Sequence, residues 1–228
     1  MTRPALPDPP FVLDPPSEGI VHERLPGCDT YRGPASGQLP AVVFVPGPVP
    51  AELPVEPRDW QIYQGYGRLA AGRGLVAVVP VLSFHGAPDV PAATEQLADI
   101  IDEVRAMPGV DPDRIAIWAF SGGGWLIGRW LAESPTWLRC LALSYPAMGD
   151  DPVQPGRPIV LTRVGQERPE LQAAVDDFLA RAKDSNTDVQ VIEVPDGRHG
   201  FDVLDHTDQS RNAVNEAMAT VAGHLTSS

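Results

Sequence analysis

A serine stands where a run of strand-forming residues meets a cluster of glycines. Residues 114–120 are apolar after the first, and Ser121 is followed directly by three glycines. A serine at such a strand-to-helix turn has a strained backbone, so the residues two before and two after it must be small. Ala119 and Gly123 meet that need, although alanine stands where glycine is usual. The spacing therefore predicts a turn that presents a serine hydroxyl as a nucleophile.

Glycines after a strand can also bind the phosphates of a nucleotide, which is an alternative function for this stretch. A dinucleotide-binding fingerprint has the spacing G-x-G-x-x-G, and counted from Gly122 its last place falls on Ile127. No Gly-Lys-Ser/Thr follows either, and nucleotide binding is not predicted. A structural role for the glycines, in which they only let a helix pack closely on a sheet, stays open until other residues are considered.

Two further residues could complete the chemistry, and each follows a predicted strand. Glu167 comes after residues 160–165, and His199 comes after residues 189–194. A serine hydroxyl needs a histidine to accept its proton, while a carboxylate fixes the tautomer of that ring and stabilises the imidazolium. Loops after parallel strands share one edge of a sheet, so we expect Ser121, His199 and Glu167 to meet. The other acids that could take this place are Asp202, Asp205, Asp150 and Asp151.

The elements that must position these residues alternate between strand and helix. Buried strands are predicted at 39–45, 75–81, 114–120 and 138–145, a further strand at 158–164, an alternating strand at 188–194, and edge strands at 20–25 and 29–32. Helices are predicted at 59–71, 94–107 (capped by Thr94), 122–133, 169–183 and 210–225. This order indicates one α/β domain over residues 20–228, with a mostly parallel sheet between helices on both faces.

Residues 1–19 form a proline-rich arm in front of that domain. Proline removes backbone donors and fixes φ, so the arm is expected to be extended, either wrapped on the domain or frayed. A short edge pairing at residues 11–13 is the open alternative.

Three motifs together resemble the α/β-hydrolase fold family, closest to dienelactone-hydrolase-like serine esterases. They occupy residues 119–123, 165–167 and 197–202. The resemblance implies a three-layer α/β-hydrolase fold and cleavage of small soluble carboxylic esters, thioesters or lactones through an acyl-enzyme. It also implies that Ser121 is the nucleophile, His199 the base and Glu167 the acid of a catalytic triad. A non-catalytic ligand-binding protein on a hydrolase scaffold and a small peptidase are the alternatives.

The loop after the strand at 39–45 departs from the pattern of that family. Many relatives carry His-Gly there, whereas residues 46–49 of this chain read Pro-Gly-Pro-Val. An oxyanion hole needs two convergent donors, and Pro48 has no N–H. We expect the N–H groups of Gly122 and Val49 to be the donors, with Gly47 as a less favoured alternative to Val49. The residues expected to line the substrate pocket are Phe84, His85 and Phe120.

The composition argues against several classes of function. A formal charge of −13 would repel nucleic acids and anionic membranes. No apolar run reaches the roughly 18 residues that span a bilayer, and the first residues lack an apolar signal core, so a cytoplasmic location is expected. Cys28 and Cys140 are too few for a disulfide framework and lack metal-ligand spacing. We expect no metal and no cofactor.

The segment between the strands at 138–145 and 158–164 bears on substrate size. Many α/β hydrolases insert a helical lid there. In this chain the segment, residues 146–157, is short and rich in proline and glycine. No lid domain is therefore expected, and the pocket would be closed by short loops or by a partner subunit in a homodimer. A shallow pocket buries little acyl chain, which favours a small-molecule ester with a short acyl group.

Overall fold

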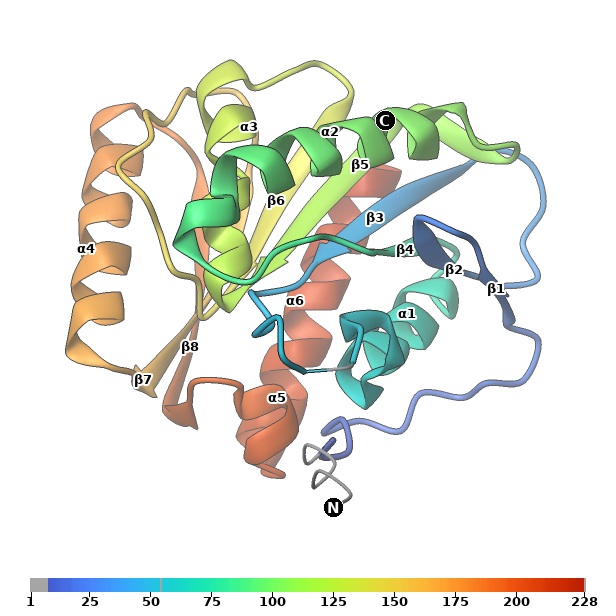
Figure 1. Cartoon of the computed structure of the whole chain (residues 1–228), viewed down its shortest axis with the longest axis horizontal. Helices are drawn as coiled ribbons and strands as arrows, with labels where there is room; N and C mark the ends of the chain where they lie inside the picture. The colour runs from blue at the N-terminus through green and yellow to red at the C-terminus, as the bar shows by residue number, and fades with distance from the viewer. Residues whose placement is uncertain (1–7, 54, 228) are drawn as a thin grey trace.

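The structure is a computed structural model that describes residues 8–53 and 55–227. An eight-stranded sheet in the order β1-β2-β4-β3-β5-β6-β7-β8 runs through the molecule (Figure 1). Its strands are β1 Val21–Arg24, β2 Cys28–Arg32, β3 Leu39–Val45, β4 Val76–Pro80, β5 Val110–Phe120, β6 Leu138–Ser144, β7 Ile159–Gln166 and β8 Val189–Arg198. The pairs from β4 through β8 are parallel, and only β1–β2 and β2–β4 are antiparallel. The predicted mostly parallel sheet is confirmed.

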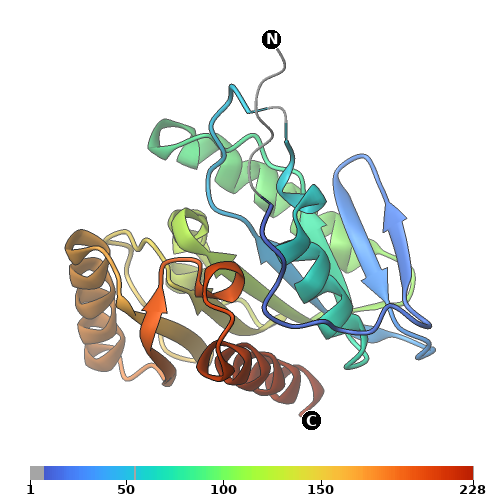
Figure 2. The ribbon, with the colours of Figure 1, turned by 90° about the horizontal axis from the view of Figure 1, so that it is seen from below.

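Helices cover both faces of this sheet (Figure 2). The α-helices are α1 Gln61–Ala71, α2 Val90–Ala106, α3 Gly128–Glu133, α4 Pro169–Asp184, α5 Phe201–Leu204 and α6 Asp208–Thr226. Short 3₁₀ helices occupy Pro57–Asp59, Ala87–Asp89 and Ser121–Leu126. Helices α1 and α6 pack on one face, and α2, α3 and α4 pack on the other. The three-layer arrangement follows from strands whose side chains are apolar on both sides.

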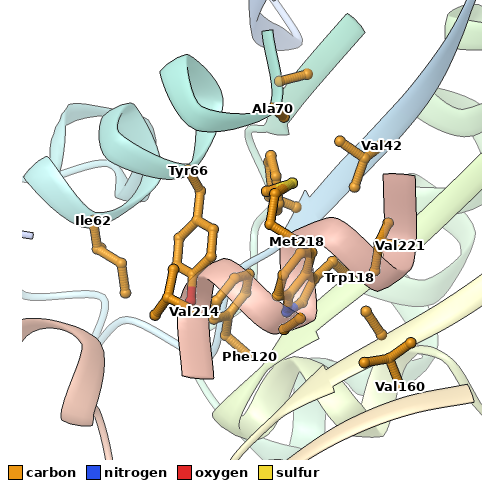
Figure 3. Close-up of a cluster of buried hydrophobic side chains, with 14 of the residues drawn as sticks. Val42, Ile62, Tyr66, Ala70, Trp118, Phe120, Val160, Val214, Met218 and Val221 are labelled. Carbon is orange, nitrogen blue, oxygen red and sulfur yellow. The ribbon is translucent and has the colours of Figure 1, made fainter. Parts of the chain in front are cut away.

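The central strands fill two cores because successive side chains point to opposite faces. On β3, Val42 and Phe44 enter the core under α1 and α6, while Val43 and Val45 enter the other core. Figure 3 shows Trp118 of β5 at the centre of the first core. Its indole N–H donates to the Ser144 hydroxyl at 2.9 Å, so the buried polar atom is satisfied.

Two helices differ from the predicted bounds. Helix α2 begins at Val90 rather than near Thr94, because a proline is tolerated in the first helical turn, where its missing N–H costs nothing. The helix predicted at 122–133 is split at Ile127 into the 3₁₀ segment and α3. Consecutive glycines have low helix propensity, which accounts for the irregular first part.

The described part of the N-terminal arm, residues 8–19, contains no strand, so the alternative of an edge pairing at residues 11–13 is wrong. The arm instead packs against α1 and α5. The ring of Phe11 lies 4.8 Å from that of Tyr66, and the N–H of Val12 donates to the carbonyl of Asp202 at 2.9 Å. Residues 1–7 of the expected arm lie outside the described residues.

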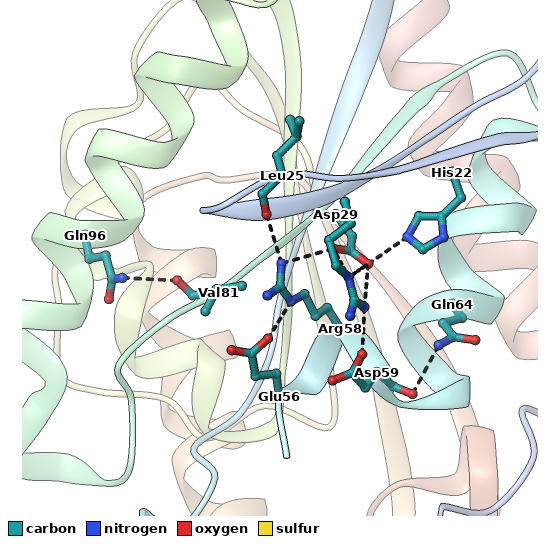
Figure 4. A network of polar contacts seen from close by, with 10 residues as sticks. His22, Leu25, Asp29, Glu56, Arg58, Asp59, Gln64, Val81 and Gln96 are labelled. Carbon is teal, nitrogen blue, oxygen red and sulfur yellow. Dashed lines mark hydrogen bonds and ion pairs between the residues drawn. The ribbon is translucent and has the colours of Figure 1, made fainter. Parts of the chain in front are cut away.

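A buried carboxylate fastens the β1–β2 hairpin to the loop before α1 (Figure 4). Asp29 of β2 is completely buried and binds His22 at 2.7 Å and Arg58 at 3.2 Å. Arg58 also donates to the carbonyl of Leu25 at 2.9 Å. Burial alone would raise the pKa of Asp29. Hydrogen bonds from Arg24 and His22 outweigh this effect, so the pKa lies below its usual value. The network therefore anchors the segment that leads into α1.

Candidate active site

Ser121 follows β5 directly and has a φ of 50°, in the left-handed region that non-glycine residues rarely adopt. The chain can turn this sharply because Gly123 approaches β3 closely. A Cβ on Gly123 would lie 2.6 Å from the carbonyl oxygen of Val45. The carbonyl of Ser121 accepts the N–H of Ala147 at 2.8 Å. The strained turn is thus held from two sides, as a nucleophile elbow requires.

The structure brings Ser121, His199 and Glu167 into one hydrogen-bonded relay. Ser121 Oγ lies 2.7 Å from His199 Nε2, and His199 Nδ1 lies 2.5 Å from Glu167 Oε2. The carboxylate accepts the Nδ1–H, which leaves Nε2 free to accept the serine proton. The other carboxylate oxygen accepts the backbone N–H of Arg168 at 2.8 Å, and the Glu167 side chain is only 6% exposed. The acid is therefore held by both oxygens.

The loop that carries His199 is fixed on both sides. Gly200 has a φ of 79° and is the N-cap residue of the short helix α5. On the other side, the backbone N–H of Arg198 donates to Asp205 at 2.8 Å, and the guanidinium binds the same carboxylate. Burial alone would raise the pKa of Asp205, but these hydrogen bonds outweigh it and lower the pKa. Asp205 therefore positions the loop and does not contact the histidine ring.

The other candidate acids lie elsewhere. Asp202 is completely buried, and its carboxylate accepts the hydroxyls of Tyr66 at 3.0 Å and Tyr145 at 2.9 Å. Burial raises the pKa of Asp202 to about 7, even though both hydrogen bonds oppose the shift. Asp151 lies against Gly128 at the start of α3, and Asp150 is exposed. Glu167 is the carboxylate that binds the histidine.

Tyr145 is a residue of the site that the sequence analysis did not single out. It has a φ of 38°, and its ring packs edge-on against His199 with the centroids 4.9 Å apart. Its hydroxyl is bound to Asp202, so the buried carboxylate holds the ring that supports the histidine. The signal in the sequence was its place at the end of a predicted strand, on the same edge as Ser121.

A pocket of about 270 Å³ opens beside Ser121. Phe120 lines it, as expected. Its remaining lining residues are Gly47, Pro48, Trp60, Ile62, Tyr63, Tyr145, His199 and Val203. Most of this lining is apolar or aromatic, and much of it comes from the first turn of α1 and the residue before it. The sequence predicted a helix at residues 59–71. It did not predict that the first residues of this helix face Ser121.

Contrary to the expectation, Phe84, His85 and Val49 lie outside the pocket beside Ser121. Phe84 and His85 line a neighbouring cavity of about 200 Å³, which shares Gly47 with the first pocket. The N–H of Val49 donates to the carbonyl of Phe84 at 3.0 Å, so it is already engaged. His85 Nδ1 binds the carbonyl of Val49 at 2.7 Å. Val49 thus pairs with the loop after β4, whereas Pro48 stays in the lining of the pocket beside Ser121.

The N–H of Gly122 remains a candidate donor for the oxyanion. Gly122 lies in the first turn of the 3₁₀ segment, where backbone N–H groups have no partner within the helix. Gly47 packs directly against it, since a Cβ on Gly47 would lie 3.4 Å from the Gly122 nitrogen and 3.3 Å from the Ser121 Cβ. This candidate donor therefore lies where the pocket meets Ser121.

Among residues 8–53 and 55–227, no three His, Cys, Asp or Glu side chains are grouped as metal ligands would be. No helix in the same part of the chain has both the length and the apolar composition of a bilayer-spanning segment.

Comparison with known proteins shows the fold. No protein-family model and no curated protein matches the sequence. Among solved structures, a Pyrobaculum calidifontis esterase aligns with a TM-score of 0.73 at 17% identity, over 95% of this chain and 88% of that one. A candidate dienelactone hydrolase from Klebsiella pneumoniae subsp. pneumoniae MGH 78578 aligns with a TM-score of 0.67 at 16% identity, over 89% and 98%. A bacterial heroin esterase aligns with a TM-score of 0.70 at 14% identity, over 95% and 88%. The expected α/β-hydrolase fold is confirmed.

Proposed function

We propose that this protein is a serine hydrolase that cleaves small soluble carboxylic esters, thioesters or lactones through an acyl-enzyme. The observation that carries the proposal is the hydrogen-bonded relay of Ser121, His199 and Glu167 beside an apolar pocket. One fold can host many activities, so the esterase names of the structural neighbours support the proposal only as analogy.

The relay supplies both proton transfers of acyl-enzyme formation. Ser121 Oγ attacks the carbonyl carbon, its proton moves to His199 Nε2, and the carbonyl π electrons move to the oxygen. When the tetrahedral intermediate collapses, the bond to the leaving oxygen or sulfur breaks, and the Nε2 proton goes to that atom. Glu167 stabilises the imidazolium that exists between the two transfers. Gly122 N–H donates a hydrogen bond to the oxyanion.

Hydrolysis of the acyl-enzyme repeats these steps with water. His199 Nε2 removes a proton from a water molecule, whose oxygen then bonds to the acyl carbon. Collapse of the second tetrahedral intermediate breaks the bond to Ser121 Oγ, which takes the proton back from the imidazolium. The carboxylic acid leaves, and the serine hydroxyl is restored without a cofactor.

The pocket fits an acyl group that is small and uncharged. Trp60, Ile62 and Val203 give it apolar walls, and its volume of about 270 Å³ leaves no long tunnel for a fatty chain. The connection between β6 and β7 carries no helix or strand at residues 146–157, so no lid domain covers the site. Both cysteines are buried and unpaired, which is typical of a reducing compartment, and we place the enzyme in the cytoplasm.

Steady-state hydrolysis of p-nitrophenyl butyrate tests the proposal. Ser121→Ala and His199→Ala should each lower kcat by at least about 10⁴-fold, because both residues act in the same proton transfer. For the same reason, the double variant should lose little more than either single one. Near-wild-type turnover by Ser121→Ala would exclude this serine as the nucleophile. A folded wild-type protein without turnover would favour the binding-protein alternative.

A further inference from the structure

The loop after β3 is poor in backbone donors for an oxyanion. Pro48 has no N–H, and the N–H of Val49 is bound to the Phe84 carbonyl at 3.0 Å. The remaining N–H of the loop, that of Gly47, faces the hydroxyl oxygen of Tyr63. Two convergent donors are needed to stabilise a tetrahedral oxyanion, and Gly122 supplies one of them. A side chain of the pocket can supply the second donor.

Tyr63 lies at the place where that donor is needed. It lines the pocket together with Ser121 and Gly47, and it is only 4% exposed. Its hydroxyl oxygen lies near the N–H of Gly47, and Gly47 packs against both Ser121 and Gly122. The phenol group therefore reaches the corner of the pocket where the nucleophile and the first donor lie.

The ring of Tyr63 is held rigidly, which a preorganised donor requires. It packs edge-on against Phe120 with the centroids 5.5 Å apart, and it stacks on Trp60 at 6.3 Å with an interplanar angle of 21°. Phe120 immediately precedes the nucleophile, so the ring and the serine are parts of one packed unit.

The hydroxyl of Tyr63 also has a proton to give. Burial, reinforced by the charge of Asp202, raises the pKa of Tyr63 far above its ordinary value, and the contact with Gly47 offsets only part of this shift. The group therefore stays protonated at neutral pH. The hydroxyls of Tyr66 and Tyr145 donate to Asp202, whereas none of the hydrogen bonds among the described residues uses Tyr63 as the donor.

We propose that the hydroxyl of Tyr63 is the second oxyanion donor, in place of a backbone N–H of the loop. The inference rests on the proposed hydrolase function. In the tetrahedral intermediate, Gly47 N–H donates to the Tyr63 oxygen, and the Tyr63 O–H donates to the substrate oxyanion beside Gly122 N–H. Each hydrogen bond in such a chain polarises the next one, so the loop still contributes through the phenol.

Substitution of Tyr63 by phenylalanine tests this role, because it removes the hydroxyl and keeps the ring packing. With p-nitrophenyl butyrate, Tyr63→Phe should lower kcat by about 10²- to 10³-fold, the usual cost of losing one oxyanion donor, and leave KM nearly unchanged. The matched control is Tyr31→Phe. It also removes a buried phenol hydroxyl, but one that has no hydrogen-bond partner and lies on β2 outside the pocket. Its kcat should equal that of the wild type.

A second readout uses n-butylboronic acid, which forms a tetrahedral adduct with a catalytic serine. Tyr63→Phe should weaken its inhibition by a factor similar to the loss in kcat. If Tyr63→Phe keeps wild-type kcat and inhibition while Ser121→Ala is inactive, the assignment of Tyr63 is overturned and the hydrolase function stands. If the wild type neither turns over the ester nor binds the boronic acid, the hydrolase function fails, and the role of Tyr63 fails with it.

Discussion

Two residues of the proposed triad, Glu167 and His199, depend on neighbours outside the triad. Glu167 is a glutamate where aspartate is commoner, and its longer side chain is steadied because its second oxygen binds the N–H of Arg168 at 2.8 Å. The imidazole of His199 is held on its edge by Tyr145 and along its loop by Asp205. The geometry of the relay therefore depends on three supporting groups, which are Arg168, Tyr145 and Asp205.

The role of Glu167 can be measured with a neutral isostere. Glu167→Gln should lower kcat by about 10³- to 10⁴-fold, since an amide cannot stabilise the imidazolium and its NH₂ can face Nδ1 and favour the wrong tautomer. Kinetics with p-nitrophenyl butyrate would show the loss. Asp150→Asn, which alters an exposed alternative acid, is the control and should leave kcat unchanged. The reverse ranking would give the acid role to Asp150.

Asp202 should make the stability of the protein depend on pH. Its folded pKa of about 7 lies above the value of about 3.9 for an unfolded chain. Between these two values the folded protein holds a proton that the unfolded chain has released, so the free energy of unfolding falls as pH rises through this window. Asp202→Asn removes this titration, although it also changes what Tyr66 and Tyr145 can donate to.

Urea unfolding of both proteins at pH 5 and pH 8 measures the effect, because the other titrating groups largely cancel in the comparison. Relative to Asp202→Asn, the wild type should lose about 2 to 3 kcal/mol of unfolding free energy between these pH values. If the wild type and Asp202→Asn differ in unfolding free energy by the same amount at both pH values, Asp202 is ionised throughout. Its two phenol donors would then compensate for burial.

At the scale of elements, the turn between β5 and the 3₁₀ segment fixes Ser121, the proposed nucleophile. Gly123 is needed there because a Cβ would lie 2.6 Å from the oxygen of Val45 and 2.8 Å from that of Pro46. Both are backbone atoms of the neighbouring strand and loop, so they cannot swing aside as a side chain would. The strain at Ser121 is maintained by this close approach.

Gly123→Ala should therefore lower the free energy of unfolding by about 1 to 3 kcal/mol and reduce kcat, because the turn must open to admit the methyl group. Gly223→Ala is the matched control. It adds the same methyl group inside α6, where no heavy atom lies within 4 Å, and should raise stability by up to about 1 kcal/mol. Thermal unfolding of both variants gives the comparison. Equal stabilities would mean that the elbow tolerates a larger residue.

The sequence predicted the elements better than it predicted the loops. The strand at 39–45 was placed correctly, because a segment buried on both faces is an unbroken apolar run with proline and glycine after it. The direction of the Val49 N–H could not be predicted, because it depends on a contact with Phe84 in a distant loop. The place of Tyr63 was missed for a similar reason, since helical periodicity does not say which residue of a first turn faces a neighbouring loop.

At the scale of the whole molecule, the proposed acyl site is the pocket of about 270 Å³ between α1 and the strand ends. A chain that extends beyond this pocket stays in water and gains little of the roughly 0.8 kcal/mol that each buried methylene provides. Specificity should therefore depend on the first few carbon atoms of the acyl group. The net charge of −13 should also disfavour binding to anionic lipid surfaces.

This view predicts how kcat/KM changes along the series p-nitrophenyl acetate, butyrate, octanoate and palmitate. The value should peak at short acyl chains and fall by octanoate, without activation by lipid vesicles, because only short chains are buried in the transition state. All four substrates should be kept in monomeric solution so that solubility does not imitate specificity. A steady rise to palmitate would require a deep acyl tunnel and contradict the small pocket.

The central claim is that Ser121 is an activated nucleophile, and covalent labelling tests it most directly. A fluorophosphonate probe reacts with a serine only when a neighbouring base removes the hydroxyl proton. Peptide mapping by mass spectrometry should find one phosphonylated residue, Ser121, in the wild type. Labelling should be absent in Ser121→Ala and much slower in His199→Ala. An unlabelled but folded wild type, or a label on another serine that persists in Ser121→Ala, would contradict the account.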